Sequence, residues 1–275
     1  MNTKELTPEF IENLSYPDFV GFINQWNSPP GAYSTLNKLA IFANLNERSN
    51  LLEVGCSTGF SSRELATLTK CRATGFDRSE QSIDKAIKLK NEYAPTLDIT
   101  YQVSNGEQFE AQEKFSHIMV GGNLAFFPNP ESMLSKCVSY LQNPGYLLAT
   151  PYYNTRQMPE ELIKKMHTDL NIPLESFKSL SKDEILNFYS NFEFLYKEEN
   201  KLIIENDYQI KKYCESVVSN FTSNTTYDNL TNELIFERLF NIRKLINETR
   251  KYQEYFILVL RYRKEVYPDQ LVPLY

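Results

Sequence analysis

The sequence has only two histidines and four cysteines among its 275 residues. The cysteines, at positions 56, 71, 137 and 214, are scattered, and none of them forms a Cys-x-x-Cys pair or lies near a histidine cluster. Zinc sites and disulfide frameworks need such groupings. The sequence therefore suggests neither, and we expect the cysteines to be reduced and mostly buried.

Long apolar runs and a basic excess are also missing. No apolar run approaches the ~20 residues that span a bilayer, and the first ten residues have no apolar core typical of a signal peptide. We therefore expect a cytoplasmic protein without membrane contact. The formal net charge is -6, and because Lys and Arg supply most non-specific affinity for nucleic acids, a nucleic-acid substrate is disfavoured. The basic residues at 243, 244, 250 and 251 are interpreted as a solvated helix face.

One stretch, Asn50–Ala66, has the pattern of a buried strand, a glycine turn and a helix that begins at Phe60. Its first apolar residues predict the strand, and Gly55 and Gly59 break it. Glycines at such a turn let the backbone pass close to a ligand, and the amide groups at the start of the next helix face whatever binds there. The stretch therefore predicts a nucleotide-type site.

The spacing of the turn distinguishes between two ligands. A dinucleotide fingerprint is Gly-x-Gly-x-x-Gly, whereas this turn is Gly55-x-x-x-Gly59, with Ser57 where a middle glycine would fall. The run Leu-Leu-Glu-Val-Gly-Cys-Ser-Thr-Gly, which carries Glu53, resembles the first motif of the class I S-adenosylmethionine-dependent methyltransferases, with Ser57 as its one departure. The resemblance extends from about residue 50 to 151 and is weak on either side. It implies that these residues and Cys56 border the cofactor, with Cys56 as a small packing residue.

The resemblance also implies cofactor contacts in the next two strands. The strand Arg72–Asp77 ends in an acid roughly 20 residues beyond the glycine turn, where a carboxylate can accept hydrogen bonds from both ribose hydroxyls. Asp77 is expected to do so, with Arg78 beside it; capping of the next helix is the alternative. In the turn at Asn105 and Gly106, the asparagine stands where the family has an acid that binds adenine. Its side-chain carbonyl could accept the same hydrogen bond, and a simple turn is the alternative.

A fourth strand that begins at Phe115 ends in a glycine pair. Ligands of open α/β sheets lie beyond the carboxyl ends of the strands, so Gly121 and the residues up to 124 should border the reacting centre. This turn lacks both the Pro-Pro element of the methyltransferases that act on nucleic-acid bases and the acid of the metal-dependent catechol type. The resemblance therefore implies a small-molecule acceptor and no metal. His117, within the strand, is interpreted as a satisfied core or rim residue.

Strands that alternate with helices predict a parallel, doubly wound α/β sheet. A helix is expected at Glu131–Leu141, a turn at Asn143–Gly145 and a fifth strand at Tyr146–Pro151. The resemblance implies a Rossmann-like seven-stranded methyltransferase sheet, mostly parallel with an antiparallel last strand and with helices on both faces. Its last two strands are expected at Phe192–Lys197 and Tyr255–Arg263.

The chain is expected to form a single domain, residues 1–275, that is larger than a minimal methyltransferase. Residues 1–46 are predicted to be an N-terminal cap, residues 47–151 the cofactor-binding core, and residues 206–250 a helical insert before the last strand. The insert has the spacing of two amphipathic helices. These helices either cover the active site or bury their apolar faces in a partner subunit, which would give a homodimer; the cover is favoured.

The acceptor should lie near the cap. Candidates for the substrate pocket are Trp26, Tyr33, Asn123, Tyr152 and Tyr153. In many small-molecule methyltransferases a tyrosine of the N-terminal segment borders the methyl group, and the resemblance implies this role for Tyr33. Trp26 could instead fill the core. If the reaction uses a general base, His167 and Tyr33 are the candidates.

The predicted function is methyl transfer from S-adenosylmethionine to an O, N or C atom of a small organic acceptor, which leaves S-adenosylhomocysteine. The protein would mainly align the two reactants and exclude water, so a diagnostic catalytic residue is not required. Two alternatives stay open at this point. One is an NAD(P)-dependent oxidoreductase, and the other is a non-catalytic scaffold with a methyltransferase-like fold.

Overall fold

The structure is a computed structural model that describes residues 7–170, 180–222 and 229–264. The first six residues of the predicted cap and residues 223–228 of the predicted insert lie outside the described residues.

Strands and helices alternate through the first half of the chain, as the sequence predicts. The elements up to the fifth strand are α1 (Pro8–Asn13), α2 (Tyr16–Phe22), α3 (Ala32–Phe42), β1 (Asn50–Val54), α4 (Phe60–Thr69), β2 (Arg72–Asp77), α5 (Glu80–Tyr93), β3 (Ile99–Val103), β4 (Phe115–Gly121), the short 3-10 helix η1 (Asn123–Phe126), α6 (Pro130–Tyr140) and β5 (Leu141–Ala149). All five residues of β1 are buried, as expected for a strand between two others in a parallel sheet covered on both faces.

The second half adds helices around an antiparallel edge. Its elements are β6 (Tyr152–Asn154), α7 (Glu160–Leu170), α8 (Lys182–Phe188), β7 (Glu193–Lys201), α9 (Asp207–Thr222), α10 (Asn229–Thr249) and β8 (Gln253–Tyr262). Helices α9 and α10 are the two predicted helices of the insert.

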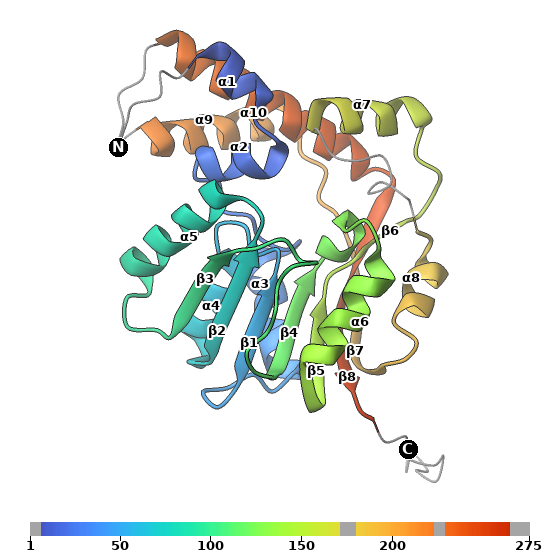
Figure 1. The fold of residues 1–275 in the computed structure, drawn as a ribbon. Coiled ribbons are helices and arrows are strands. Elements are labelled where there is room, and N and C mark those ends of the chain that lie inside the picture. The colour runs from blue at the N-terminus through green and yellow to red at the C-terminus, as the bar shows by residue number, and fades with distance from the viewer. Residues whose placement is uncertain (1–6, 171–179, 223–228, 265–275) are drawn as a thin grey trace.

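The strands form one eight-stranded sheet with the order β3-β2-β1-β4-β5-β8-β6, and β7 also pairs with β8. The pairs among β1 to β5 are parallel, whereas β8 runs antiparallel to β5, β6 and β7. This topology confirms the predicted fold class, and β6 is a short strand that the sequence analysis did not predict. In Figure 1 the carboxyl ends of the parallel strands face a layer of helices made of α1, α2, α7, α9 and α10.

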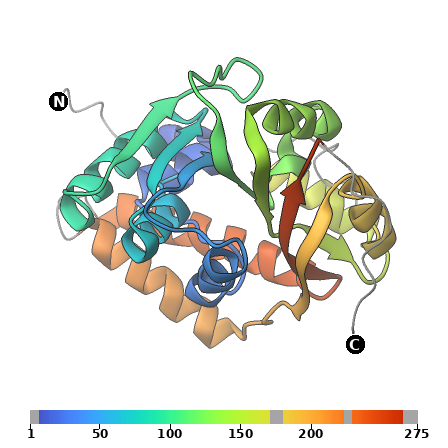
Figure 2. The same ribbon diagram turned by 90° about the horizontal axis from the view of Figure 1, so that it is seen from below.

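Each face of the sheet has its own apolar core. Leu51 of β1 packs with residues of α3, α4 and α5, whereas Leu52 and Val54 pack with residues of α6 and α8. Alternate side chains of a strand point to opposite faces, so one short strand contributes to both cores. Figure 2 shows α3 and α4 on one side of the sheet and α6 on the other.

A third apolar core lies within the helical layer that faces the carboxyl ends of the strands. This layer, made of α1, α2, α7, α9 and α10, is called the cap from here on. The core joins Ile11 and Phe19 of the N-terminal helices with Leu170 of α7, Ile210 of α9 and Leu239 of α10. The apolar faces of the insert are therefore buried within the chain, next to the carboxyl ends of the strands (Figure 1).

The predicted turn at Asn143–Gly145 is wrong, because these residues belong to β5. Leu141 lies opposite Phe115, and the next pair in the register is Tyr146 with His117, so the segment is an irregular bulge in the ladder between β4 and β5. A bulge leaves residues unpaired and tolerates a proline, which has no amide hydrogen to donate. The pair that Gly145 makes with Tyr262 of β8 brings the end of this segment into the sheet.

Candidate active site

The glycine turn between β1 and α4 is tightly wound. Gly55, Ser57 and Gly59 all have left-handed backbones, with φ of 67°, 48° and 71°. Side chains disfavour this conformation, which explains two glycines so close together, and the serine adopts it at some cost. The turn brings the backbone between β1 and α4 to the carboxyl edge of the sheet.

Cys56, in this turn, points away from that edge. Its amide donates to the carbonyl of Phe76 at 2.9 Å, and its buried side chain belongs to the core cluster of α3, α4 and α5. Burial raises the pKa of its thiol well above the ordinary value. The interpretation of Cys56 as a packing residue is confirmed, and only its backbone is left to border a cofactor.

Asp77 lies at the end of β2 and reaches the glycine turn of the neighbouring strand. One carboxylate oxygen accepts a hydrogen bond from the Ser57 amide and the other from the Ser79 amide, both at 2.9 Å. Burial raises the pKa of this carboxyl above its usual value. The cap of helix α5 is Ser79, whose side chain accepts from the Ser82 amide. Asp77 is therefore not the capping residue, and its ribose role stays a prediction.

Glu53 of β1 stabilises the start of α4, directly after the glycine turn. Its buried carboxylate accepts a hydrogen bond from the Ser62 amide at 2.9 Å, and burial raises its pKa. Tyr101 of β3 reaches the same place, because its hydroxyl donates to the Gly59 carbonyl at 2.9 Å and lies 3.0 Å from the Ser62 hydroxyl. These contacts fix the start of α4 against two strands, and a direct contact of Glu53 with a cofactor stays a prediction.

The residues of the turn after β3 make contacts within the protein, where the resemblance implies contacts with adenine. The side-chain carbonyl of Asn105 accepts from the Glu107 amide at 3.2 Å, as in a simple turn. A Cβ at Gly106 would lie 2.3 Å from the Phe127 ring, so this glycine permits close packing within the protein. Arg78 is exposed. The adenine contacts of these residues stay predictions.

At the end of β4, Asn123 binds the glycine turn. Its side-chain amide donates to the carbonyls of Val54, at 2.9 Å, and Gly55, at 3.0 Å. Asn123 was predicted to line the substrate pocket. The structure shows that it lies in η1, just after β4, and holds the glycine turn in place.

Gly121, at the end of β4, is loosely surrounded compared with the other glycines of the site. A Cβ at this glycine would find no atom of the described residues closer than 3.9 Å, and the nearest atom is the Thr150 hydroxyl. That hydroxyl is buried and has no hydrogen-bond partner within the described part of the chain. A polar ligand group would satisfy it. The sequence analysis missed Thr150, because a threonine at the end of an apolar strand looks like an ordinary β-former.

The two tyrosines of β6 point in opposite directions. The Tyr153 side chain is buried against Phe256, and its hydroxyl donates to Glu254 at 2.8 Å. Its prediction as a pocket residue is wrong, because alternate residues of β6 face opposite sides of the sheet. Tyr152 is 39% exposed, yet burial raises the pKa of its hydroxyl to about 12. Its ring lies 3.2 Å from where a Cβ at Gly122 would be, so it stands beside the end of β4.

The connector between α2 and α3 lies on the glycine turn. The Thr58 hydroxyl donates to the Gln25 carbonyl at 3.0 Å, and the Asn27 amide donates to the Ser57 hydroxyl at 3.3 Å. The N-terminal segment therefore covers the turn that was predicted to bind the cofactor.

Residues 45–191 match the model of a family described as "Methyltransferase domain". This match spans slightly more than half of the chain. The chain belongs to this methyltransferase family. Membership confirms the resemblance seen in Asn50–Ala66 and the assignment as an S-adenosylmethionine-dependent methyltransferase over the oxidoreductase alternative.

Curated relatives of this methyltransferase are O-methyltransferases. Malonyl-[acyl-carrier protein] O-methyltransferase 2 of Ilyobacter polytropus is 25% identical over 155 residues, which cover 54% of this chain and 59% of the relative. The chain thus matches less than two thirds of that protein. The ubiquinone biosynthesis O-methyltransferase of Glaesserella parasuis is 25% identical over 209 residues, which cover 68% of this chain and 86% of the relative.

Solved structures share the fold of the methyltransferase. The crystal structure of MccD protein superposes with a TM-score of 0.68 at 26% identity, covering 86% of this chain and 100% of that one. A methyltransferase from Thiobacillus denitrificans, solved in complex with S-adenosyl-L-homocysteine, has a TM-score of 0.66 at 15% identity and covers 89% and 98%. At that identity the second likeness shows the fold alone.

Two aromatic candidates of the methyltransferase flank Phe60 at the start of α4. Trp26 is 38% exposed, and its ring packs against Phe60 and the guanidinium group of Arg63, so it does not fill the core. Tyr33 is 56% exposed, and its ring packs edge-on with the ring of Phe60. Both side chains are accessible beside the glycine turn, and their pocket roles stay predictions.

The two histidines have different surroundings. His117 is buried, with Nε2 at 2.9 Å from the Ala43 carbonyl and Nδ1 at 2.8 Å from the Ser116 hydroxyl, which confirms its interpretation as a satisfied core residue. His167 lies on α7 in the cap (Figure 1), and its role as a base stays a prediction. Within residues 7–170, 180–222 and 229–264, there is no group of three or more His, Cys, Asp or Glu side chains that could hold a metal. No helix of these ranges is long and apolar enough to cross a membrane.

We expect the stability of the wild type to depend more steeply on pH than that of a His117→Gln variant. Burial lowers the pKa of His117 in the folded protein, so the unfolded chain binds the proton more readily. Stability is then retained above a pH of about 6.5 and lost as the pH falls below it. Urea unfolding of both proteins at neutral and mildly acidic pH measures this. Equal pH slopes would contradict a buried neutral imidazole.

Proposed function

We propose that this methyltransferase binds S-adenosylmethionine across the carboxyl ends of β2, β1 and β4 and transfers the methyl group to a small organic acceptor under the cap. The observation that carries the proposal is the contact between Asp77 and the amide of Ser57. It places an acid able to bind ribose hydroxyls directly beside a left-handed glycine turn, as nucleotide cofactors require.

The residues at this edge fit the cofactor. The turn offers backbone amides at the start of α4, a Cβ at Gly121 would meet no described atom closer than 3.9 Å, and the Thr150 hydroxyl there has no partner within the described residues. The connector at Gln25–Asn27 covers the turn and would exclude water from it.

When bound, S-adenosylmethionine supplies a methyl group already activated on a sulfonium, which the acceptor's electron pair displaces to leave S-adenosylhomocysteine. The residues of the chain then align the acceptor with that group and keep water out, which is the main source of rate in such transfers. Tyr152 and Tyr33 are positioned to border the acceptor, one at the end of β4 and one at the start of α4. Oxygen is the favoured acceptor atom, since both curated relatives are named O-methyltransferases.

The insert is proposed to cover the active site. Its apolar faces are buried against α1, α2 and α7 within the same chain, which supports a cover more than a subunit interface. A homodimer through residues 206–250 and a cytoplasmic location remain predictions.

Calorimetric binding of S-adenosylmethionine and S-adenosylhomocysteine tests the proposal. We expect both to bind the wild type saturably and Asp77→Ala to weaken both by about tenfold or more, because the variant loses a charge-assisted hydrogen bond. Asp77→Asn should have an intermediate effect, since an amide keeps one acceptor oxygen without the charge.

The matched control is Asp98→Ala, which removes an exposed acid just before β3, at the opposite edge of the sheet. It should leave cofactor affinity unchanged. Thermal unfolding of each variant separates lost affinity from lost fold. If the folded wild type binds neither compound, the proposal fails and the chain is a scaffold with a methyltransferase fold.

A further inference from the structure

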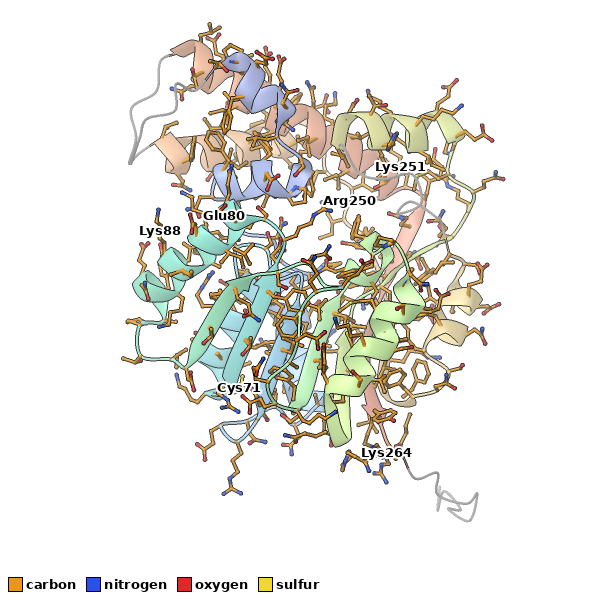
Figure 3. All side chains as sticks on the ribbon, viewed as in Figure 1. Cys71, Glu80, Lys88, Arg250, Lys251 and Lys264 are labelled. Carbon is orange, nitrogen blue, oxygen red and sulfur yellow. The ribbon has the colours of Figure 1, made fainter. Side chains whose placement is uncertain are left out.

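Two arginines share one glutamate where the insert meets the sheet. Glu205 accepts from Arg243 at 2.9 Å and from Arg250 at 2.7 Å. Asn247 fixes this arrangement, because its side-chain amide donates to the Glu205 carbonyl and its oxygen accepts from the Glu205 amide, at 2.9 and 2.8 Å. Figure 3 shows Arg250 at the junction between the cap helices and the sheet. The charged side chains are 23%, 17% and 15% exposed for Arg243, Arg250 and Glu205.

The cluster carries one positive charge more than Glu205 neutralises. Among the described ion pairs, the two arginines have no second carboxylate, and the Nε of Arg243 is buried without a hydrogen-bond partner. The lysines next to them in sequence are exposed and bind other acids: Lys244 pairs with Asp207 and Lys251 with Glu248. Arg250 also donates to the Ile203 carbonyl at 2.8 Å, which is neutral, so the excess positive charge of this partly buried cluster favours an anion.

One tyrosine contacts the cluster, and Tyr16 and Tyr152 are close enough to interact electrostatically with its arginines. The Arg243 guanidinium stacks over the Tyr213 ring at 4.3 Å. Burial raises the pKa of Tyr16, at the start of α2, to about 12, as it does for Tyr152. Both hydroxyls therefore keep their protons and can donate hydrogen bonds. Burial also raises the pKa of Tyr213.

The cluster adjoins the proposed reacting centre through β6 and β8. Tyr152 pairs with Tyr255, and the Thr155 amide donates to the Tyr252 carbonyl at 2.9 Å. The chain from Arg250 to Tyr255 thus runs beside β6. The positive charge of Arg250 partly offsets the effect of burial on the pKa of Tyr152, which is consistent with this proximity.

We propose that the methyl acceptor is anionic and that its carboxylate or phosphate group docks between Arg243 and Arg250, while its nucleophilic atom points toward Gly122. The inference rests on the proposed function, since it names the acceptor class of that same site. Guanidinium groups bind carboxylates and phosphates in a bidentate way, and the tyrosine hydroxyls supply further donors.

The test is calorimetry on the full chain saturated with S-adenosylhomocysteine. The probes are benzoate, phenylphosphate and the neutral benzamide, because they share one aromatic ring, which can pack against tyrosine rings, and differ in charge. We expect at least one anion to bind saturably and benzamide to bind about tenfold more weakly or not at all. Tighter binding of benzoate indicates a carboxylate acceptor, and tighter binding of phenylphosphate indicates a phosphate.

Variants of the cluster should act in opposite directions. Arg243→Gln and Arg250→Gln each leave Glu205 one arginine and should weaken anion binding by about tenfold. Glu205→Gln removes the competing carboxylate and should tighten anion binding. A loss of structure could only weaken that binding. Lys244→Gln removes the same charge from an exposed position next to Arg243 and should leave the affinity for the anion unchanged.

The two proposals fail separately. If S-adenosylhomocysteine does not bind, the proposed function falls and this inference falls with it. If S-adenosylhomocysteine binds but neither anion does, or benzamide binds as well as benzoate, only the anionic acceptor is overturned. The same holds if the arginine variants bind the anion as the wild type does.

Discussion

A Gly59→Ala variant is expected to lose about 2–4 kcal/mol of unfolding free energy. The glycine has φ of 71°, which an alanine adopts only at a cost, and a new Cβ would lie 2.5 Å from the ring of Tyr101. That ring cannot move away freely, because it is buried and its hydroxyl bonds to the Gly59 carbonyl and lies next to Ser62. The turn must shift instead, so affinity for S-adenosylhomocysteine should fall as well.

Gly121→Ala is the matched control for stability. Gly121 also has a left-handed backbone, with φ of 52°, but a Cβ there would meet nothing within the described residues closer than 3.9 Å. Urea unfolding should therefore show only the backbone cost, about 1 kcal/mol. If Gly59→Ala is as stable as Gly121→Ala, the Tyr101 ring does not limit the space beside Gly59.

Local pattern was sufficient to predict the elements that carry the proposed cofactor site. The alternation of strand, turn and helix in β1, α4 and β2 gave the bounds of these elements closely, and parallel strands bring their carboxyl ends together. The contact between Asp77 and Ser57 follows from that geometry. Glu53 was found by its motif, although its contact with the Ser62 amide needed coordinates.

Contacts between distant segments could not be read from the sequence. The hydrogen bond between Thr58 and Gln25 joins the turn to a connector without a regular pattern. β6 is only three residues long, too short for its alternation to show in the sequence, so Tyr153 was placed on the wrong side. Arg243 and Arg250 were interpreted as part of a solvated helix face, and this was wrong for both, because Glu205 lies 38 and 45 residues earlier in the chain.

The second large effect is expected from Asn123→Asp. The side chain keeps its size, but its donor amide becomes a carboxylate that faces the carbonyls of Val54 and Gly55, where Asn123 now donates at 2.9 and 3.0 Å. Two hydrogen bonds become two repulsive contacts, so we expect about 2–4 kcal/mol less stability and about 100-fold weaker binding of S-adenosylhomocysteine.

Acidic pH should partly restore Asn123→Asp, and this behaviour identifies the mechanism. The facing carbonyls disfavour the ionised form and so raise the folded-state pKa of the new acid above its unfolded value. The folded protein then binds the proton more tightly, and stability relative to the wild type recovers as the pH falls through that pKa. Asn123→Ala, which loses the hydrogen bonds without adding a charge, should cost about 1 kcal/mol with no such recovery. Urea unfolding of both variants between neutral and mildly acidic pH decides the matter, since a deficit that is the same at every pH would show that Asn123 does not donate to the glycine turn.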